Sequence, residues 1–349
     1  MVKRRSFVKA ALGTAVASYM PTAQSIAADI PALTLTGQET TLSEAMLKEL
    51  SASLRGDVVL PGDADYDHVR RAWNGAFEKR PALIARCHGV ADVTEAIHFA
   101  RSNELVTAVR AGGHSMAGKS VCEGGNFGIV TAFEYQLHTV GPTVLNVANV
   151  YPYAQAREML EFYFEFMQDA PDDLYIGAGL INRYSGSPIN YVKLQQRNDD
   201  NNPHGRKYYS KSGFFNDVGS DLINNLVDGF DRAVTPRTVV LVSPLGGAVG
   251  RVTPDDTAFY HRDAQFNIEV ALSWEDADVS ADNIEWGRDF WRDVAPFASR
   301  GFYVNTEMDP SESRLRQNYG SNYDRLVDLK YKYDPKNMFR LNANIKPNA

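Results

Sequence analysis

Hydrophobic and polar positions along the chain predict short strands and amphipathic helices whose arrangement changes near residue 125. Before that point, the apolar runs at 82–86 and 105–109 have the length and composition of buried strands. Between them, Asp92-Val-Thr-Glu95 has the form of a capping box and opens a helix whose apolar positions fall on one face. After residue 128, Phe133, Tyr135 and Leu137 alternate with polar residues, which is the period-two pattern of a half-buried strand.

From residue 144 onward, the pattern predicts strands beside grouped helices. Strands are expected at 144–150, 174–178, 191–195, 238–242 and 266–274, and helices at 155–168, 221–230, 281–294 and 323–333. Such a grouping is typical of an antiparallel sheet with helices on one face. The strand, helix, strand and glycine-rich loop that come earlier are typical of an α/β cofactor-binding domain. The predicted fold class is therefore α+β, in two domains.

Residues 1–28 have the pattern of an export signal. Arg4 and Arg5, followed by Ser-Phe-Val-Lys, precede an apolar stretch from Ala10 to Met20 and a group of small residues. A charged start, a short apolar stretch and a small-residue cleavage site are typical of a secretory signal, and paired arginines are typical of the twin-arginine kind. We therefore expect a periplasmic or extracellular protein. Because twin-arginine export carries folded proteins, this signal also favours a bound cofactor.

Composition and charge exclude several other classes of function. The chain has 349 residues and a net charge of −7, and its basic residues form no stripe, so a nucleic-acid partner is not expected. No later segment is long and apolar enough to span a membrane, and no spacing of ligands predicts a metal site. The two cysteines, Cys87 and Cys122, could pair after export or remain free and buried, and the sequence favours the second slightly.

The glycine-rich loop at 110–120 fits three different motifs. As a phosphate-binding P-loop, Gly113–Ser120 would need a helix that begins at Lys119, but three glycines follow within the next eight residues. As the nucleophile elbow of a serine hydrolase, the same loop would present Ser115, with His204 or His261 as the base. A serine hydrolase therefore stays as an alternative, although no helix is expected after the serine.

The third interpretation covers much more of the chain. Residues 80–87, 92–93 and 109–118 resemble the opening of an FAD-binding domain of the vanillyl-alcohol-oxidase or p-cresol-methylhydroxylase type. Tyr66, Asn74-Gly75 and Cys122 are similar to its berberine-bridge-enzyme-like branch. The segments that resemble this branch's substrate domain and closing segment are 208–212, 245–248, 257–262, 303–305, 318–326, 332–339 and 342–347. Two clusters in the right order, far apart in the chain, make the resemblance specific.

The resemblance implies a two-domain flavoprotein that oxidises a hydroxyl-bearing small molecule, such as a sugar, alkaloid or polyketide, with molecular oxygen. It implies FAD bound covalently through His114, and catalytic roles for Tyr319 and, as second choice, Tyr303. The cofactor-binding residues that it implies are Arg110, Gly112, Gly113, His114, Ser115, Gly118, Asn342 and Asn344. The physical chemistry agrees, because glycines let backbone N–H groups approach the FAD phosphates closely.

The sequence departs from this family at 124–126. There, a segment that resembles the early part of the FAD-binding domain runs directly into one that resembles its exit, so a stretch of βα units is expected to be missing. We therefore divide the chain into a signal at 1–28, a partial FAD-binding domain at 29–138, a substrate domain at 139–300 and a closing segment at 301–349. The loss puts firm FAD binding in doubt, and a non-catalytic exported remnant is a second alternative.

Overall fold

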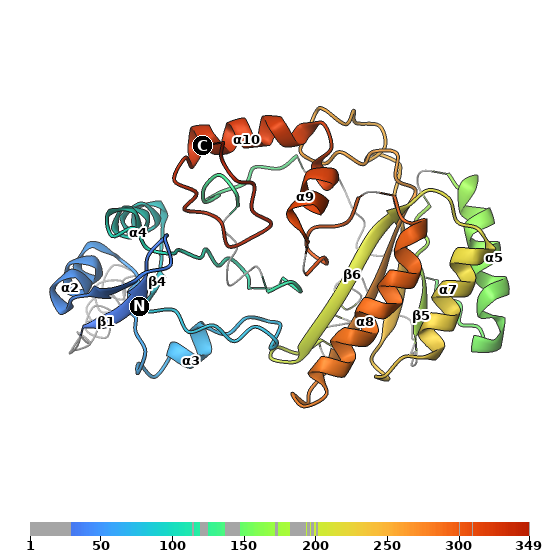
Figure 1. The fold of residues 1–349 in the computed structure, drawn as a ribbon, viewed down its shortest axis with the longest axis horizontal. Helices are drawn as coiled ribbons and strands as arrows, with labels where there is room; N and C mark the ends of the chain where they lie inside the picture. Colours follow the sequence, from blue (N-terminus) through green and yellow to red (C-terminus); the bar gives the residue numbers. More distant parts are fainter. Residues whose placement is uncertain are drawn as a thin grey trace, which may run out of the picture.

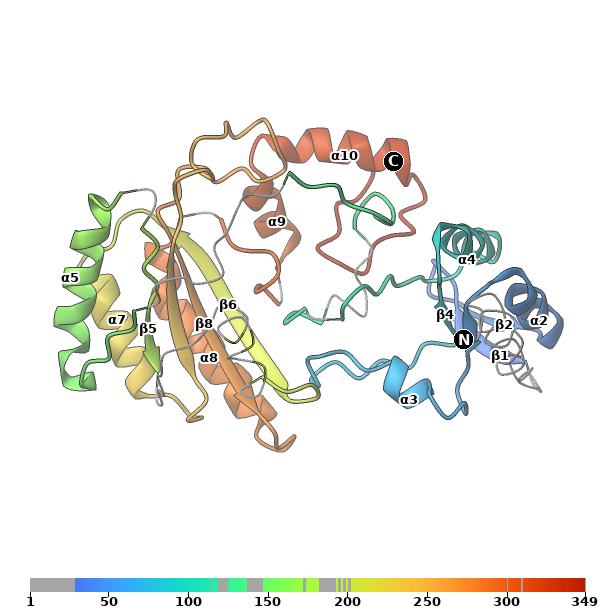
Figure 2. The same ribbon diagram turned by 180° about the vertical axis from the view of Figure 1, so that it is seen from behind.

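The computed structural model describes residues 29–113, 115–118, 125–136, 147–171, 174–181, 202–299, 301–308 and 310–348, together with residues 193, 196 and 199. Figures 1 and 2 show a helix-covered sheet at one end of this part of the molecule and the N-terminal elements at the other end. The C-terminal helices α9 and α10 lie between these two regions (Figure 1). The predicted α+β fold class is confirmed.

The sheet has four antiparallel strands in the order β5-β7-β8-β6. They are β5 (Ala178–Ile181), β6 (Lys207–Phe215), β7 (Val239–Pro244) and β8 (Phe266–Trp274). The two long strands pair over nine residues, from Lys207 opposite Trp274 to Phe215 opposite Phe266. Since β6 is at an edge, one of its sides is open to other parts of the chain.

Three helices cover one face of this sheet: α5 (Ala156–Gln168), α7 (Ser220–Asp231) and α8 (Ser280–Val294). They lie in front of the strands in Figure 1 and behind them in Figure 2. Leu226 on α7, Val294 on α8 and Ile268 on β8 are fully buried in the core between the two layers. Amphipathic helices on a sheet face remove both apolar surfaces from water, which is the main driving force for this arrangement.

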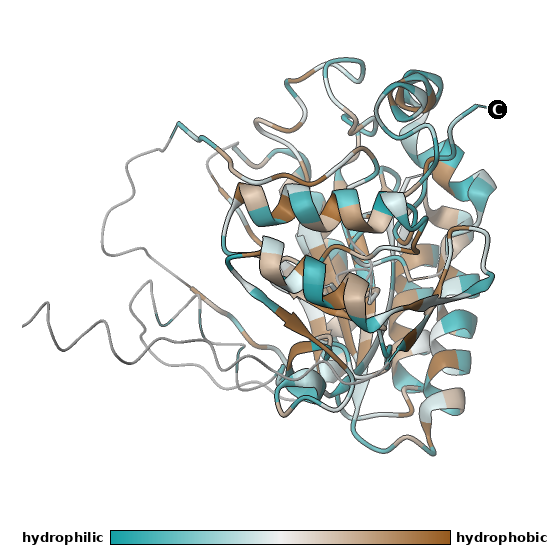
Figure 3. Cartoon of the chain, turned by 90° about the vertical axis from the view of Figure 1, so that its left-hand side faces the viewer, coloured by the Kyte–Doolittle hydropathy of each residue, from teal (hydrophilic) through white to brown (hydrophobic). Residues whose placement is uncertain are grey.

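The N-terminal region contains only short elements. They are β1 (Ile30–Leu33), β2 (Glu39–Leu42), α2 (Glu44–Ser53), β3 (Asp57–Val59), α3 (Tyr66–Val69), β4 (Ile84–Arg86) and α4 (Val90–Ser102). The strands form two separate two-stranded antiparallel sheets. Figure 3 views the molecule from this side and shows hydrophobic and hydrophilic residues alternating along the nearest helices. The core here, around Leu47 and Leu50, is accordingly smaller.

The capping box expected at Asp92-Val-Thr-Glu95 does not form, so that prediction is wrong. Helix α4 begins at Val90, and Gly89 precedes it as the N-cap. The Asp92 carboxylate instead accepts hydrogen bonds from the backbone N–H groups of Arg55, Gly56 and His88, at 3.0, 3.0 and 2.8 Å. These backbone donors hold the pKa of Asp92 below its usual value. Asp92 therefore ties the end of β4 to the chain that follows α2.

Several predicted strands are not formed in the described part of the chain. Residues 105–109 form a single bridge, between Thr34 and Leu105, and no ladder. Residues 131–136 and 147–150 are not in strands, and residues 174–177 come before β5. A strand needs neighbours for its backbone groups, and the described residues provide none at these positions.

The C-terminal segment forms α9 (Glu312–Tyr319) and α10 (Asn322–Tyr333). The fully buried Lys330 ammonium donates to the carbonyls of Asn126 and Phe339 and to the Asp334 carboxylate, at 2.6, 2.8 and 2.7 Å. Burial lowers the pKa of Lys330, while the Asp334 carboxylate acts in the opposite direction. These contacts attach the chain just after the 124–126 junction to the closing segment.

The helices expected at 155–168, 221–230, 281–294 and 323–333 are confirmed to within one or two residues, as are the strands at 238–242 and 266–274. Strand β6 and helix α9 were not predicted. Cys87 is exposed rather than buried, and Cys122, like most of 191–195, lies outside the described residues. Within the described ranges, no helix combines the length and hydrophobicity of a membrane span, and no cluster of His, Cys, Asp and Glu is suited to a metal ion.

Candidate functional site

The glycine-rich loop has the backbone shape that a phosphate cradle needs. Gly113 and Gly118 adopt φ angles of +73° and +66°, which disfavour any other residue. A Cβ atom at Gly118 would also lie 2.2 Å from the Phe77 ring, whereas one at Gly112 would meet no heavy atom within 4 Å. Gly112 therefore leaves its backbone open to a close approach.

Arg110 and Ser115 are the other predicted residues of this loop that the structure describes. The Arg110 guanidinium donates to the carbonyl of Val69 and lies against Gly113. Ser115 is only 8% exposed, so its hydroxyl is not presented to an open surface as a hydrolase nucleophile should be. His114 and the start of the helix that a P-loop needs, at Lys119, lie outside the described residues.

The second predicted group, Asn342 and Asn344, lies next to the chain that follows the 124–126 junction. The Asn126 side chain donates to the carbonyl of Ala343 at 3.2 Å and accepts from the N–H of Ile345 at 2.9 Å. The amide oxygen of Asn344 is buried and has no hydrogen-bond partner within the described chain. A buried acceptor without a donor is destabilising by about 1–3 kcal/mol, so this atom is suited to a ligand that brings an N–H or O–H group.

The sheet contributes a site residue that the sequence did not reveal: Glu269, in the middle of β8. Its neighbours Ile268 and Val270 are buried under the helices, so Glu269 points to the opposite face of the sheet, where Ser210 and Ser212 are also buried. On that face it lies directly across from Ser212 on β6 and Leu241 on β7. A lone acid in the apolar strand sequence FNIEVALSW was the available signal.

Burial raises the pKa of Glu269 to about 7. Its side chain keeps some contact with solvent, but protein surrounds most of the carboxyl group and penalises the charged form. A carboxyl group with a pKa near neutrality changes protonation state easily at the pH of the cell. Such groups are suited to accepting a proton in catalysis, so we place Glu269 at the centre of the candidate site.

The segment 303–308 packs along the free edge of β6, beside Ser212. The Ser212 and Thr306 hydroxyls are 2.7 Å apart, and the N–H of Tyr303 donates to the Ser212 hydroxyl at 3.3 Å. On the other side of the strand, Lys211 and the fully buried Glu307 form an ion pair with a 2.5 Å N–O distance. These contacts fix the segment that carries the predicted Tyr303.

The two predicted tyrosines differ in environment. Tyr303 is 46% exposed, and its hydroxyl accepts from the side-chain amide of Asn305 at 2.9 Å. Tyr319 packs against Phe127 and Tyr323, and its pKa is raised by burial. A tyrosine base needs the opposite shift, so Tyr319 stays a protonated phenol at neutral pH. The catalytic roles of both tyrosines stay predictions.

Helix α9 is held in place by the segment before β8. Tyr260 packs against Gly320, where a Cβ atom would lie 2.5 Å from the ring. The neighbouring His261 is only 8% exposed and packs beside Phe214, Tyr260 and Gly301. Burial is the main effect on His261 and lowers its pKa. His261 is therefore part of the packing around α9, not an accessible base as the hydrolase alternative would require.

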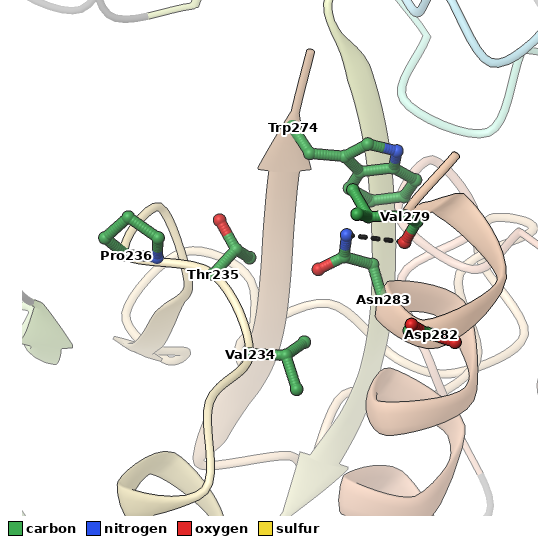
Figure 4. A pocket seen from close by; sticks show the side chains of 7 residues that line it. All are labelled: Val234, Thr235, Pro236, Trp274, Val279, Asp282 and Asn283. Carbon is green, nitrogen blue, oxygen red and sulfur yellow. Dashed lines mark hydrogen bonds between the residues drawn. The ribbon is translucent and has the colours of Figure 1, made fainter. Parts of the chain in front are cut away.

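A separate cavity of about 250 Å³ lies at the other end of β8, beside the first turn of α8. In Figure 4, Trp274, Val279 and Asn283 face Val234 and Thr235 across it, and the Asn283 amide donates to the Val279 carbonyl at 2.8 Å. Its lining is Val234, Thr235, Pro236, Trp274, Val279, Asp282 and Asn283. None of the predicted site residues is among them.

The described residues fit FAD in the parts of the site that they form. The loop offers two glycines with positive φ and an open approach at Gly112, which is suited to the pyrophosphate. The closing segment offers the unpartnered amide oxygen of Asn344, which is suited to a polar ring edge. The remaining contacts would have to come from other parts of the chain.

A glycine-rich loop beside a helix-covered antiparallel sheet, with an acid on the sheet face away from the helices, resembles a flavin-linked oxidoreductase. The family model "Berberine and berberine like" matches residues 302–346, which include α9 and α10. A FAD-linked oxidoreductase of Dictyostelium discoideum is 30% identical over 281 residues, covering 70% of this chain and 59% of that protein. The chain is similar in sequence to the berberine-bridge-enzyme-like FAD-linked oxidoreductases.

The solved structures agree on the fold. The 6-hydroxy-D-nicotine oxidase of Arthrobacter nicotinovorans aligns with a TM-score of 0.72 at 16% identity, over 85% of this chain and 99% of that one. A chitooligosaccharide oxidase aligns with a TM-score of 0.73 at 15% identity, over 87% and 100% of the two chains. By sequence, however, the chain spans about 59% of the length of its Dictyostelium relative. The resemblance inferred from the motifs is confirmed.

Proposed function

We propose that the chain oxidises a hydroxyl-bearing small molecule, of sugar, alkaloid or polyketide type, with FAD as cofactor and molecular oxygen as acceptor. When bound, FAD would take a hydride from the substrate carbon and pass the electrons to oxygen, which gives hydrogen peroxide. The observation that carries the proposal is Glu269, which lies opposite Ser212 on the sheet face away from the helices and has a pKa raised to about 7 by burial. The similarity of the chain to FAD-linked oxidoreductases supports the same chemistry.

Glu269 would accept the proton of the substrate hydroxyl as the hydride leaves the adjacent carbon. A carboxylate with a pKa near 7 is half ionised at neutral pH, so it is both available and basic enough for this transfer. Tyr303 and Tyr319 would act as hydrogen-bond donors to the substrate, because a phenol that keeps its proton can donate. Gly112 and Gly113 would hold the pyrophosphate through backbone N–H groups, with Asn342 and Asn344 at the ring. Gly118, whose N–H donates to the Ser115 carbonyl at 3.2 Å, would shape the loop around the cofactor.

We also propose that His114 binds FAD covalently, as the resemblance implies. The test is the absorbance spectrum of the purified full chain, followed by acid precipitation. Wild-type protein should be yellow and should keep flavin fluorescence in the pellet, while His114→Ala should release its flavin into the supernatant. Covalent flavin in the variant would contradict the attachment site. A colourless wild-type protein would contradict the proposed function itself.

A flavin-free remnant is the second candidate, and one observation favours it. Residues 105–109 lead into the glycine loop without a strand ladder, so the loop has little support on that side. Inserting the corresponding βα units of a relative between Gly124 and Gly125 separates the two candidates. If the remnant is correct, the natural chain should lack flavin and the insertion should supply it.

Export through the twin-arginine pathway is a further proposal, made from the sequence of residues 1–28 alone. The supporting feature is the Arg4-Arg5 pair before a short apolar stretch. Replacing both arginines with lysines should keep the protein in the cytoplasm, which cell fractionation measures. Unchanged export of the double variant would exclude this pathway.

A further inference from the structure

A single side chain, Asn74, joins the glycine loop to the sheet. It is 0% exposed, and its amide nitrogen donates to the carbonyls of Met116 on the loop and Tyr208 on β6, at 2.5 and 2.9 Å. Its amide oxygen accepts from the N–H groups of Tyr208 and Ala76, both at 3.0 Å. The side chain thus uses both donors and both acceptor positions, and it pairs with Tyr208 as a neighbouring strand would.

The residues beside Asn74 strengthen the same junction. Trp73 donates its backbone N–H to the Gly113 carbonyl at 3.1 Å, and its ring stacks on Tyr208 with centroids 3.9 Å apart. Gly75 donates to the Arg206 carbonyl at 2.7 Å. A Cβ atom at Gly75 would lie 2.1 Å from the Gly205 carbonyl oxygen, so only glycine permits this approach. Three segments far apart in the sequence therefore meet at one point.

This junction has a fixed relation to the candidate base. Tyr208 and Ser212 are on the same strand, four positions apart, and Ser212 lies opposite Glu269 in the β6–β8 register. Four residues of a strand span roughly 13 Å, and a paired strand is stiff over that length. The position at which Asn74 attaches the loop to β6 therefore sets the distance from the loop to Glu269.

We propose that Asn74 is a positioning residue that holds the glycine loop at a set offset from the sheet, and so places the loop's ligand relative to Glu269. It acts through the backbone of Met116 and Tyr208 and touches neither substrate nor cofactor. The catalytic part of this inference rests on the proposed function, whereas the coupling of loop and sheet does not. An amide is required because one group must donate to two carbonyls and accept from an N–H on the same strand.

The test combines hydrogen exchange with flavin reduction, on the full chain. In Asn74→Ala, amide exchange should become roughly tenfold faster in peptides covering 113–118 and 205–209 together, because each loses a buried hydrogen bond. Asn74→Asp keeps the acceptor for the N–H groups of Tyr208 and Ala76 but loses the donors to the carbonyls of Met116 and Tyr208. The strand keeps one of its two hydrogen bonds and the loop keeps none, so this variant should loosen the loop more than the strand. If the alanine variant does not fold, the aspartate variant carries the test.

The matched control is Asn126→Ala, which removes a similar two-sided amide contact from Ala343 and Ile345. It should accelerate exchange in the closing segment and leave 113–118 and 205–209 unchanged. In protein that carries flavin, Asn74→Ala should slow reduction by substrate about tenfold or more while changing substrate affinity by less than about threefold, since small misplacements act on the chemical step.

Two results would overturn the proposal. Faster exchange confined to residues 73–77 would show that Asn74 stabilises only its own turn. An unchanged reduction rate in flavin-loaded Asn74→Ala would show that the offset does not affect the chemistry. Wild-type protein without flavin would contradict the proposed function instead, and the exchange data would still decide whether Asn74 couples the loop to the sheet.

Discussion

The sheet region and the glycine-loop region carry complementary halves of one site, but they are built very differently. The sheet pairs β6 with β8 over nine residues and buries its other face under three helices. The loop is preceded by three-residue strands and a single bridge at Leu105, and it is followed by exposed aromatic residues. The acid is thus fixed by dense packing, while the cofactor loop depends on a few contacts such as those of Asn74. Loss of FAD-binding units should therefore leave the base in position and weaken only the cofactor site.

The largest expected effect is on chemistry at the sheet. Glu269→Gln removes the proton acceptor but keeps the shape of the side chain, so flavin reduction by substrate should slow by roughly 100-fold to 10,000-fold. Stopped-flow absorbance of flavin-loaded protein measures this rate. Glu285→Gln, at an exposed position of α8, is the control and should react like wild type. A Glu269→Gln variant with wild-type rate would show that Glu269 is not the base.

The second prediction concerns the contact between the chain after the junction and the closing segment. Lys330→Met removes an ammonium with three buried acceptors and leaves the Asp334 carboxylate without its cation, so the free energy of unfolding should fall by about 3–5 kcal/mol. Urea denaturation measures the loss. Lys332→Met, two positions along α10 and exposed, should change stability by less than about 0.5 kcal/mol. Equal effects would mean that the buried contacts of Lys330 contribute nothing specific.

The third prediction compares the two cores directly. Leu226→Ala empties a site that is 0% exposed in the sheet region, and should lower the free energy of unfolding by about 4 kcal/mol. Leu105→Ala, at 8% exposed in the looser region, should lower it by about 2 kcal/mol or less, because the surroundings can collapse into the space. Both are measured by urea denaturation. Losses of equal size would show that the N-terminal core is packed as tightly as the sheet.

The smallest expected effect is the pH dependence contributed by Glu269. Its folded pKa of about 7 lies above the ordinary value of 4.5, so the folded chain binds this proton more tightly than the unfolded chain. Wild-type stability should therefore decrease as pH rises from about 4.5 to about 7, by at most about 3 kcal/mol. Glu269→Gln should be more stable than wild type at pH 8 and about equal at pH 4. Unfolding curves at both pH values test this, and an identical difference at both would exclude the raised pKa.

The sequence predicted the sheet region well because its signals are local and strong. Helices at 221–230 and 281–294 alternate apolar and polar positions over several turns, and the strand at 266–274 is mostly apolar. The strands expected at 105–109 and 133–137 failed for the opposite reason. Their apolar patterns are real, but a strand forms only where other strands pair with it, and pairing is a property of distant sequence.

The candidate site was predicted only in part. Glycine positions at 112, 113 and 118 could be read from the chain, because positive φ angles and close approaches require glycine. Glu269 could not be distinguished from an acid on an exposed strand, since its pKa depends on which face the helices cover. Asn74 was noticed only as part of a resemblance, because three of its four hydrogen bonds reach residues that are 42 and 134 positions away.

The side-chain amide of Asn126 fastens the chain immediately after the 124–126 junction, as Asn74 does before it, so the two ends of the junction are anchored independently. Chain inserted between such anchors adds little constraint: the entropy of closing a loop grows only as about (3/2)RT ln n, or roughly 0.6 kcal/mol for each doubling of its length. Gly124-Gly125 is consequently a point at which βα units can be added or removed at little cost in loop-closure entropy. The core between the four-stranded sheet and its helices is made by residues outside this junction, so such a change would leave that core in place.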